Sequence, residues 1–248
     1  MDKRFYFEKE NLQNDVAPLK VGDKIFLSGE ENNHFSKVLR GKVGDSAEFF
    51  YDGSDLYIAT AIEVGKNTSV FEIVSISPCQ SNPNISVTLF QGLPKLDKLE
   101  LITQKLCEIG VIKIIPFTSK FTIAKENGGK IDRLNKISIS ACKQCGRTKL
   151  LKVESPIKFD KMLENLSHFD MVIFANEKEK ERTLSNLILS SKSAKNIAII
   201  VGSEGGFSDD EIERLSTISS SITLGKRILR TETAPIFISS VVFFMFEN

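Results

Sequence analysis

Residues 201–212 combine the residue types of a ligand-binding turn. They run Val-Gly-Ser-Glu-Gly-Gly-Phe-Ser-Asp-Asp-Glu-Ile and begin at the end of an apolar run typical of a buried strand. The lysine of a phosphate-binding loop and the glycine spacing of a dinucleotide fold are both missing, and the carboxylate of Glu204 would repel a pyrophosphate. The segment indicates either a phosphate-free ligand site or a structural turn whose glycines allow positive φ.

The second segment of interest, residues 224–234, places Arg230, Thr231, Glu232 and Thr233 directly before an apolar stretch. A cation and a carboxylate this close to the end of a short predicted strand are candidates for chemistry. The pattern is also typical of a capped helix start with a solvated Arg–Glu pair.

The third segment, residues 141–147, lies within a basic stretch from Lys125 to Lys161 that has ten Lys or Arg against four Asp or Glu. Its two cysteines have C-x-x-C spacing, but no second pair lies at a zinc-site distance, so we expect no metal. Gln144 and Arg147 suit RNA base edges and phosphates. Near the N-terminus, His34 and Arg40 are further candidates for RNA contact, although the acidic balance there favours ordinary surface or core positions.

The elements that must position these residues fall into two parts. Residues 1–78 show short β segments, and a Pro-containing polar run then breaks the pattern, so we predict a small β-barrel or sandwich followed by a domain over residues 79–248. There the expected strands are 85–93, 111–117, 171–175, 197–201 and 222–224, and the expected helices are 96–109, 130–145, 181–190, 209–218 and 234–246. This alternation predicts an α/β domain with a mostly parallel sheet, whose ligands sit at the carboxyl ends of the strands.

The composition fits a folded, cytoplasmic protein. The 248 residues are 41% hydrophobic and 26% charged, which excludes a disordered chain, and 33 Lys or Arg nearly balance 32 Asp or Glu. We see no secretory signal, and the longest apolar stretch, residues 236–246, is too short to span a membrane. The four cysteines are too few and too scattered for a disulfide framework.

Together the segments resemble the bacterial 16S ribosomal RNA uracil-N3 methyltransferases of the knotted SPOUT superfamily. Matching motifs occur in order over essentially the whole chain: His34, Val38 to Arg40, Gly44 and Asp45, then Glu108, Gly110 and Val111, then Gln144 to Arg147, then Gly202 to Gly206, and Leu224 to Thr233. Ser203 stands where the family pattern has a proline.

The resemblance implies a PUA-like RNA-binding barrel over residues 1–78 and a SPOUT domain with a deep trefoil knot over residues 79–248. It further implies a homodimer that binds 16S ribosomal RNA, and S-adenosylmethionine held in a cleft of three loops. The implied cofactor-binding residues are Ala175, Gly202, Glu204, Gly205, Leu224, Gly225, Ile228 and Leu229, and the implied RNA-binding residues are His34, Arg40, Gln144 and Arg147.

For the reaction, the resemblance implies attack of an unpaired uracil N3 on the methyl group. Arg230 would stabilise the developing uracil anion, and Glu232 or Glu108 would orient that arginine or accept the proton, with Glu204 as a further candidate. Two alternatives stay open. One is a non-catalytic RNA-binding factor for ribosome assembly, and the other is a 2′-O-ribose methyltransferase of the same superfamily.

Overall fold

The structure is a computed structural model that describes residues 3–8, 11–12, 18–123, 129–189 and 193–247. It divides into two compact units, residues 1–82 with 142–150, and residues 83–141 with 151–248. Lys125, where the predicted basic stretch begins, and Ser190, where a predicted helix ends, lie outside the described residues.

The first unit is built on a five-stranded sheet in the order β1-β3-β4-β5-β2. Its elements are β1 (Arg4–Tyr6), β2 (Lys24–Ser28), α1 (Gly29–Asn33), a π-helix (His34–Val38), β3 (Ser46–Phe50), β4 (Asp55–Val64) and β5 (Thr68–Pro78). Only the β1–β3 pair is parallel. Alternate apolar residues of these strands form a core rich in aromatic rings, so the β segments expected from the sequence are present, while the two short helices were not foreseen.

Segment 142–150 belongs to this first unit, although it begins in the last turn of α3 (Gly129–Cys145), whose earlier residues belong to the second. The Thr148 hydroxyl donates to the Gly53 carbonyl at 2.8 Å, and the Asn82 amide donates to the Thr148 hydroxyl at 2.8 Å. Lys143 forms an ion pair of 2.7 Å with Glu31. Gln144 and Arg147 therefore belong to the β-rich unit and not to the unit that contains most of α3.

The second unit contains a seven-stranded sheet in which every observed pair is parallel, with the order β12-β10-β11-β6-β7-β8 and β9 also beside β7. The strands are β6 (Ser86–Gly92), β7 (Lys113–Thr118), β8 (Lys152–Val153), β9 (Ile157–Lys158), β10 (Met171–Ala175), β11 (Asn196–Val201) and β12 (Ser220–Ile222). The helices are α2 (Leu96–Ile109), α3, α4 (Phe159–Asn165), a 3-10 turn (Leu166–His168), α5 (Leu184–Leu189), α6 (Asp209–Ser216) and α7 (Thr233–Glu247).

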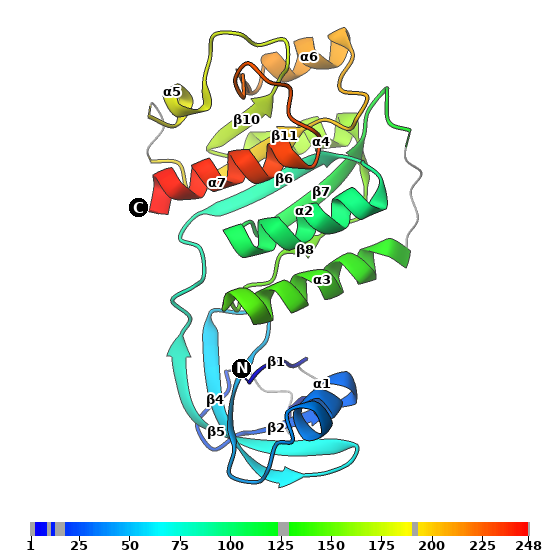
Figure 1. Ribbon diagram of the computed structural model, residues 1–248. Coiled ribbons are helices and arrows are strands. Elements are labelled where there is room, and N and C mark those ends of the chain that lie inside the picture. The colour runs from blue at the N-terminus through cyan, green and yellow to red at the C-terminus, as the bar shows by residue number, and fades with distance from the viewer. Residues whose placement is uncertain (1–2, 9–10, 13–17, 124–128, 190–192, 248) are drawn as a thin grey trace. The chain divides into compact units, whose positions relative to one another are not determined.

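Helices cover both faces of this sheet. One face packs its alternate residues, such as Phe90 and Ile200, against Met162 of α4 and Leu215 of α6. Helices α2 and α7 run side by side over the other face (Figure 1). This confirms the α/β class with a parallel sheet, because a strand buried on both sides needs the continuous apolar runs seen in the sequence.

The element boundaries follow the sequence closely where the apolar period is long. The expected helix 96–109 and strand 171–175 match the observed α2 and β10. The predicted helix 181–190 is shorter in the structure, since α5 begins only at Leu184. The short elements β8, β9 and α4 were missed because none spans enough residues to show a period. Among the described residues, no helix is long and apolar enough to cross a membrane.

Candidate functional site

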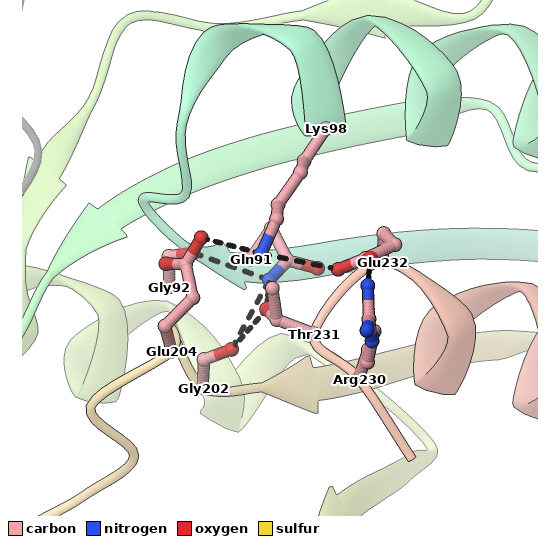
Figure 2. A network of polar contacts seen from close by, with 8 residues as sticks. All are labelled: Gln91, Gly92, Lys98, Gly202, Glu204, Arg230, Thr231 and Glu232. Atoms are coloured by element: carbon pink, nitrogen blue, oxygen red, sulfur yellow. Dashed lines mark hydrogen bonds and ion pairs between the residues drawn. The ribbon is translucent and has the colours of Figure 1, made fainter.

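Three segments meet at the carboxyl ends of β6 and β11. Gln91 and Gly92 end β6, Gly202 follows β11, and Thr231 precedes α7. The chain reaches Thr231 from the edge strand β12, so it returns toward the middle of the sheet before entering the last helix. Figure 2 shows these residues gathered around one polar centre. The parallel sheet therefore brings the two sequence segments singled out for chemistry, 201–212 and 224–234, to one place.

The buried amide of Gln91 joins the three segments. Its Nε2 donates to the carbonyl of Gly92 at 3.1 Å, to the carbonyl of Gly202 at 3.3 Å and to the hydroxyl of Thr231 at 2.9 Å. Thr231 in turn donates its hydroxyl hydrogen to the Gly202 carbonyl at 2.6 Å. Because a buried amide that loses its partners costs free energy, this network holds the two loops at a fixed separation.

A cluster of charges lies beside this network. The Lys98 ammonium, on the first turn of α2, is 2.8 Å from Glu204 and 3.4 Å from Glu232. Its hydrogen bond to Glu204 is the main cause that raises the pKa of Lys98. Burial acts to raise the pKa of Glu204, but the hydrogen bond and charge of Lys98 outweigh it and leave that pKa below its usual value. Lys98 and Glu204 therefore form a stable ion pair at neutral pH.

Arg230 stands at the open side of the cluster. Its guanidinium is 3.9 Å from Glu232, and its side chain is 84% exposed whereas that of Glu232 is 14% exposed. An ion pair of this length with one exposed partner is weak. Arg230 is thus held near the site while remaining available to an incoming anion.

The glycine-rich turn approaches β6 too closely for a larger residue. A Cβ on Gly92 would lie 2.2 Å from the backbone nitrogen of Ser203, and a Cβ on Gly202 would lie 2.8 Å from the ring of Phe207. The hydroxyl of Ser203 and the Oε1 atom of Gln91 are buried and have no hydrogen-bond partner among the described residues. The turn therefore packs tightly on its backbone and leaves two polar atoms unsatisfied.

The exit of the turn is fixed by the capping box expected from the sequence. Glu211 accepts hydrogen bonds from the backbone nitrogen of Ser208 at 2.9 Å and from its hydroxyl at 3.1 Å. Its other carboxylate oxygen accepts from the backbone nitrogen of Lys120 at 2.9 Å. Glu211 thereby ties the start of α6 to the loop after β7.

Comparison with known proteins decides the family. Residues 80–243 match a family model described as an RNA methyltransferase domain. The chain is 34% identical over 237 residues to the ribosomal RNA small subunit methyltransferase E of Buchnera aphidicola, covering 93% of this chain and 91% of the relative. It is also 34% identical over 223 residues to the protein of that name from Rickettsia conorii, covering 88% of each. The chain belongs to the ribosomal RNA small subunit methyltransferase E family. This confirms the resemblance seen in the sequence.

A solved structure supports the same conclusion. A ribosomal RNA small subunit methyltransferase E from Neisseria gonorrhoeae, bound to S-adenosyl methionine, superposes with a TM-score of 0.84 at 25% identity and covers 99% of this chain and 98% of that one. The α/β fold with helices on both faces of its sheet is therefore the fold of a methyltransferase E.

Most of the cofactor-binding residues predicted for this methyltransferase E chain lie at the carboxyl ends of β10, β11 and β12. Ala175 ends β10, Gly202 and Gly205 lie in the turn after β11, and the positive φ of Gly225 (102°) turns the chain after β12. The others in this group are Glu204, Leu224, Ile228 and Leu229. Ile228 is among the most exposed apolar side chains of the described residues.

Next to Ala175 the structure has a small polar cavity. Its volume is about 330 Å³, and it is lined by Asn176, Lys178, Glu179 and Arg182 and by three serines from the end of α6 to β12, which are Ser216, Ser219 and Ser221. Serine hydroxyls there are already bonded, since Ser216 and Ser219 donate to carbonyls of α6. The cavity shares no residue with the Gln91 network.

Two predicted site residues, Glu108 and Arg147, differ from the other candidates in their position or exposure. Glu108 pairs with Lys105 at 3.0 Å, at the opposite end of α2 from Lys98 and about 15 Å along the helix axis, so it does not join the Arg230 cluster. Arg147 is 2% exposed, so its side chain is buried in the structure, unlike the exposed Gln144 of the same segment. His34 and Arg40 of the first unit are also exposed.

Gln91 and Lys98 were missed from the sequence. Gln91 directly follows the apolar pair Leu89 and Phe90 near the end of β6, and an amide at that point of a buried strand is the one sequence signal that could have indicated it. Lys98 lies on the polar face of an amphipathic helix, where a lysine is ordinary. No group of His, Cys, Asp or Glu that could hold a metal occurs in the described part of the chain.

Proposed function

We propose that this chain transfers a methyl group from S-adenosylmethionine to N3 of a specific uridine in the 16S ribosomal RNA of the small subunit. The observation that carries the proposal is the meeting of the turn after β11 and the Arg230–Thr233 segment at one end of a parallel sheet, in a member of the methyltransferase E family. Figure 2 shows both segments hydrogen-bonded to the side chain of Gln91 on β6. A parallel sheet binds its ligand at this edge.

The residues at this edge fit an adenosyl sulfonium better than a phosphate ligand. The adenine and methionine ends would be held by backbone amides and carbonyls near the following residues: Ala175, Gly202, Gly205, Leu224, Gly225, Ile228 and Leu229. The buried Ser203 hydroxyl and the buried Gln91 Oε1 atom have no hydrogen-bond partner within the described part of the chain. Buried polar atoms are normally hydrogen-bonded, so this favours a ligand rich in hydrogen-bonding groups. The carboxylate of Glu204 suits a cationic ligand. When bound, the cofactor supplies an activated methyl group.

Residues of the chain itself would stabilise and deprotonate the uracil substrate. Uracil N3 must lose its proton as it forms a bond to the methyl carbon, while the bond from that carbon to sulfur breaks. The exposed guanidinium of Arg230 stabilises the negative charge that develops on the uracil, in the manner of an oxyanion hole. We assign to Glu232, 3.9 Å from Arg230, the role of orienting that arginine or of accepting the proton. Lys98 keeps the pKa of Glu204 below its usual value despite burial, which disfavours Glu204 as the proton acceptor.

The first unit provides a second RNA surface. His34 begins the π-helix, Arg40 lies two residues after its end, and Gln144 lies on segment 142–150, which belongs to the same unit. Arg40 has a φ of 52°, a left-handed backbone conformation that non-glycine residues rarely adopt and that is often found where function requires it. These exposed groups bind phosphates and base edges, and their local placement offsets the acidic composition of residues 1–78.

The finer architecture follows from the same proposal. The first unit is a PUA-like barrel, and the second is a SPOUT domain in which the segment that carries Thr231 is part of a trefoil knot. The protein acts as a homodimer in the cytoplasm, where its ribosomal RNA substrate is found. Sedimentation of the purified protein at several concentrations tests the dimer, and a monomer at all concentrations would contradict it.

The decisive experiment incubates the purified protein with methyl-labelled S-adenosylmethionine and small subunits from cells that lack this activity. Mass spectrometry of RNA fragments then locates the label. A methyl group on N3 of one uridine supports the proposal. A label on a ribose 2′-oxygen would assign the chain to the other methyltransferase class, and saturable RNA binding without cofactor binding in calorimetry would identify an assembly factor.

A further inference from the structure

Lys98 makes contacts that its own helix does not explain. It lies in the first turn of α2, where the partial positive charge of the helix end disfavours a cation. Yet its ammonium reaches Glu204 in the turn after β11 and Glu232 in the segment before α7 (Figure 2). Lys105, on the same helix, instead pairs with Glu108 three residues further on. Lys98 therefore contacts the turn after β11 and the segment before α7, and it forms no ion pair with the described residues of α2.

The two carboxylate oxygens of Glu232 face different cations. Oε2 lies 3.4 Å from Lys98, and Oε1 lies 3.9 Å from Arg230. Glu232 is largely buried at 14% exposure, and a buried carboxylate without a cation is costly. If Lys98 were absent, Arg230 would be the remaining cation near Glu232 among the described residues, and its guanidinium would be drawn onto that carboxylate.

We propose that Lys98 is a positioning residue for methyl transfer, which compensates the charge of Glu232 so that Arg230 is free to face the uracil. Its second contact, with Glu204, holds the glycine-rich turn against the same point. Lys98 thus sets the position of the substrate-binding arginine and of the cofactor-binding turn together. This inference rests on the proposed function for the part that concerns Arg230, and on geometry alone for the joining of the two loops.

The test compares Lys98→Met with Lys98→Arg and with the control Lys105→Met, which removes an ion pair from the same helix outside the site. We expect Lys98→Met to lower kcat for methyl transfer about tenfold, because the misplaced Arg230 stabilises the anion less well. Lys98→Arg keeps a cation and restores most of the rate, and Lys105→Met stays within about twofold of the wild type. At saturating S-adenosylmethionine and in an Arg230→Ala background, Lys98→Met lowers kcat by much less than tenfold, because the part of its effect that acts through that arginine is already lost.

Hydrogen exchange gives a readout that does not depend on activity. Lys98→Met is expected to speed amide exchange in residues 202–206 and 230–233, while Lys105→Met leaves both segments unchanged. Wild-type kcat in Lys98→Met, or a loss that adds in full to that of Arg230→Ala, would overturn the assignment to Arg230. Unchanged exchange in both segments would overturn the joining of the loops. If the wild-type protein transferred no methyl group, the proposed function would be wrong. Hydrogen exchange would still show whether Lys98 joins the two loops.

Discussion

The hydroxyl of Thr231 donates a hydrogen bond of 2.6 Å to the carbonyl of Gly202, and this bond links the segment before α7 to the turn after β11. The same hydroxyl accepts a hydrogen bond from the Gln91 amide at 2.9 Å. One side chain therefore serves as donor and acceptor between two loops from different strands. The geometry of both loops depends on this hydroxyl, because neither loop is part of the sheet that supports them.

Replacing Thr231 by Val keeps the shape of the side chain and removes the hydroxyl. The Gly202 carbonyl then retains only the longer bond from Gln91, and we expect the free energy of unfolding to fall by about 1–3 kcal/mol. Affinity for S-adenosylmethionine, measured by calorimetry, should fall about tenfold, which corresponds to about 1.4 kcal/mol. Thr231→Ser retains the hydroxyl and serves as the control. Equal affinity in the Val and Ser variants would show that the bond does not shape the cofactor site.

Replacing Arg230 by Ala separates chemistry from folding. The side chain is 84% exposed, so the free energy of unfolding should change by less than about 0.5 kcal/mol and cofactor binding should persist. The rate of methyl transfer should fall about 100-fold to 1000-fold, as for removal of a group that stabilises a developing anion. Lys226→Ala, an exposed cation of the same loop, is the matched control. Methylation at the normal rate in Arg230→Ala would remove this residue from the mechanism.

The parts of the fold that the sequence predicted well are those with a strong local signal. The capping box of Ser208 and Glu211 is written within four consecutive residues and forms as expected. The helix α2 shows a full apolar period and ends at Gly110, whose φ of 128° favours glycine. The physical cause of such a pattern lies within a few consecutive residues, so the element can be predicted without knowing how the rest of the chain folds.

The parts that could not be predicted depend on contacts between distant segments. Gln91 and Lys98 matter because the sheet order places β6 and α2 beside loops that lie far away in the chain, and no local pattern encodes that order. Arg147 occurs in a basic stretch that suggested an RNA-facing side chain, yet the side chain is only 2% exposed in the structure. Charge composition predicts exposure only on average over a stretch, and tertiary packing decides whether each side chain is exposed.

Replacing Gly92 by Ala tests the close approach of β6 and the glycine-rich turn. The added Cβ would lie 2.2 Å from the Ser203 nitrogen, and because both partners are backbone, one of them must move. We expect a loss of about 1–3 kcal/mol in the free energy of unfolding and weaker cofactor binding. Gly53→Ala, where the nearest atom lies 3.7 Å away, is the control and should keep wild-type values. A stable, cofactor-binding Gly92→Ala protein would contradict the packing described here.

The Lys98–Glu204 ion pair predicts how stability depends on pH. The pKa of Glu204 is lowered in the folded protein, so its contribution is present above its ordinary value of 4.5 and is lost as the pH falls through the lowered pKa. The pKa of Lys98 is raised above 10.5, so its contribution is present below 10.5 and is lost as the pH rises through the raised pKa. The pair should therefore contribute a constant amount between these limits. Comparing urea unfolding of wild type and Glu204→Gln across pH measures this directly: the difference should be flat at neutral pH and shrink below 4.5. A difference that instead grows in acid would mean that Glu204 is not held as a carboxylate by Lys98.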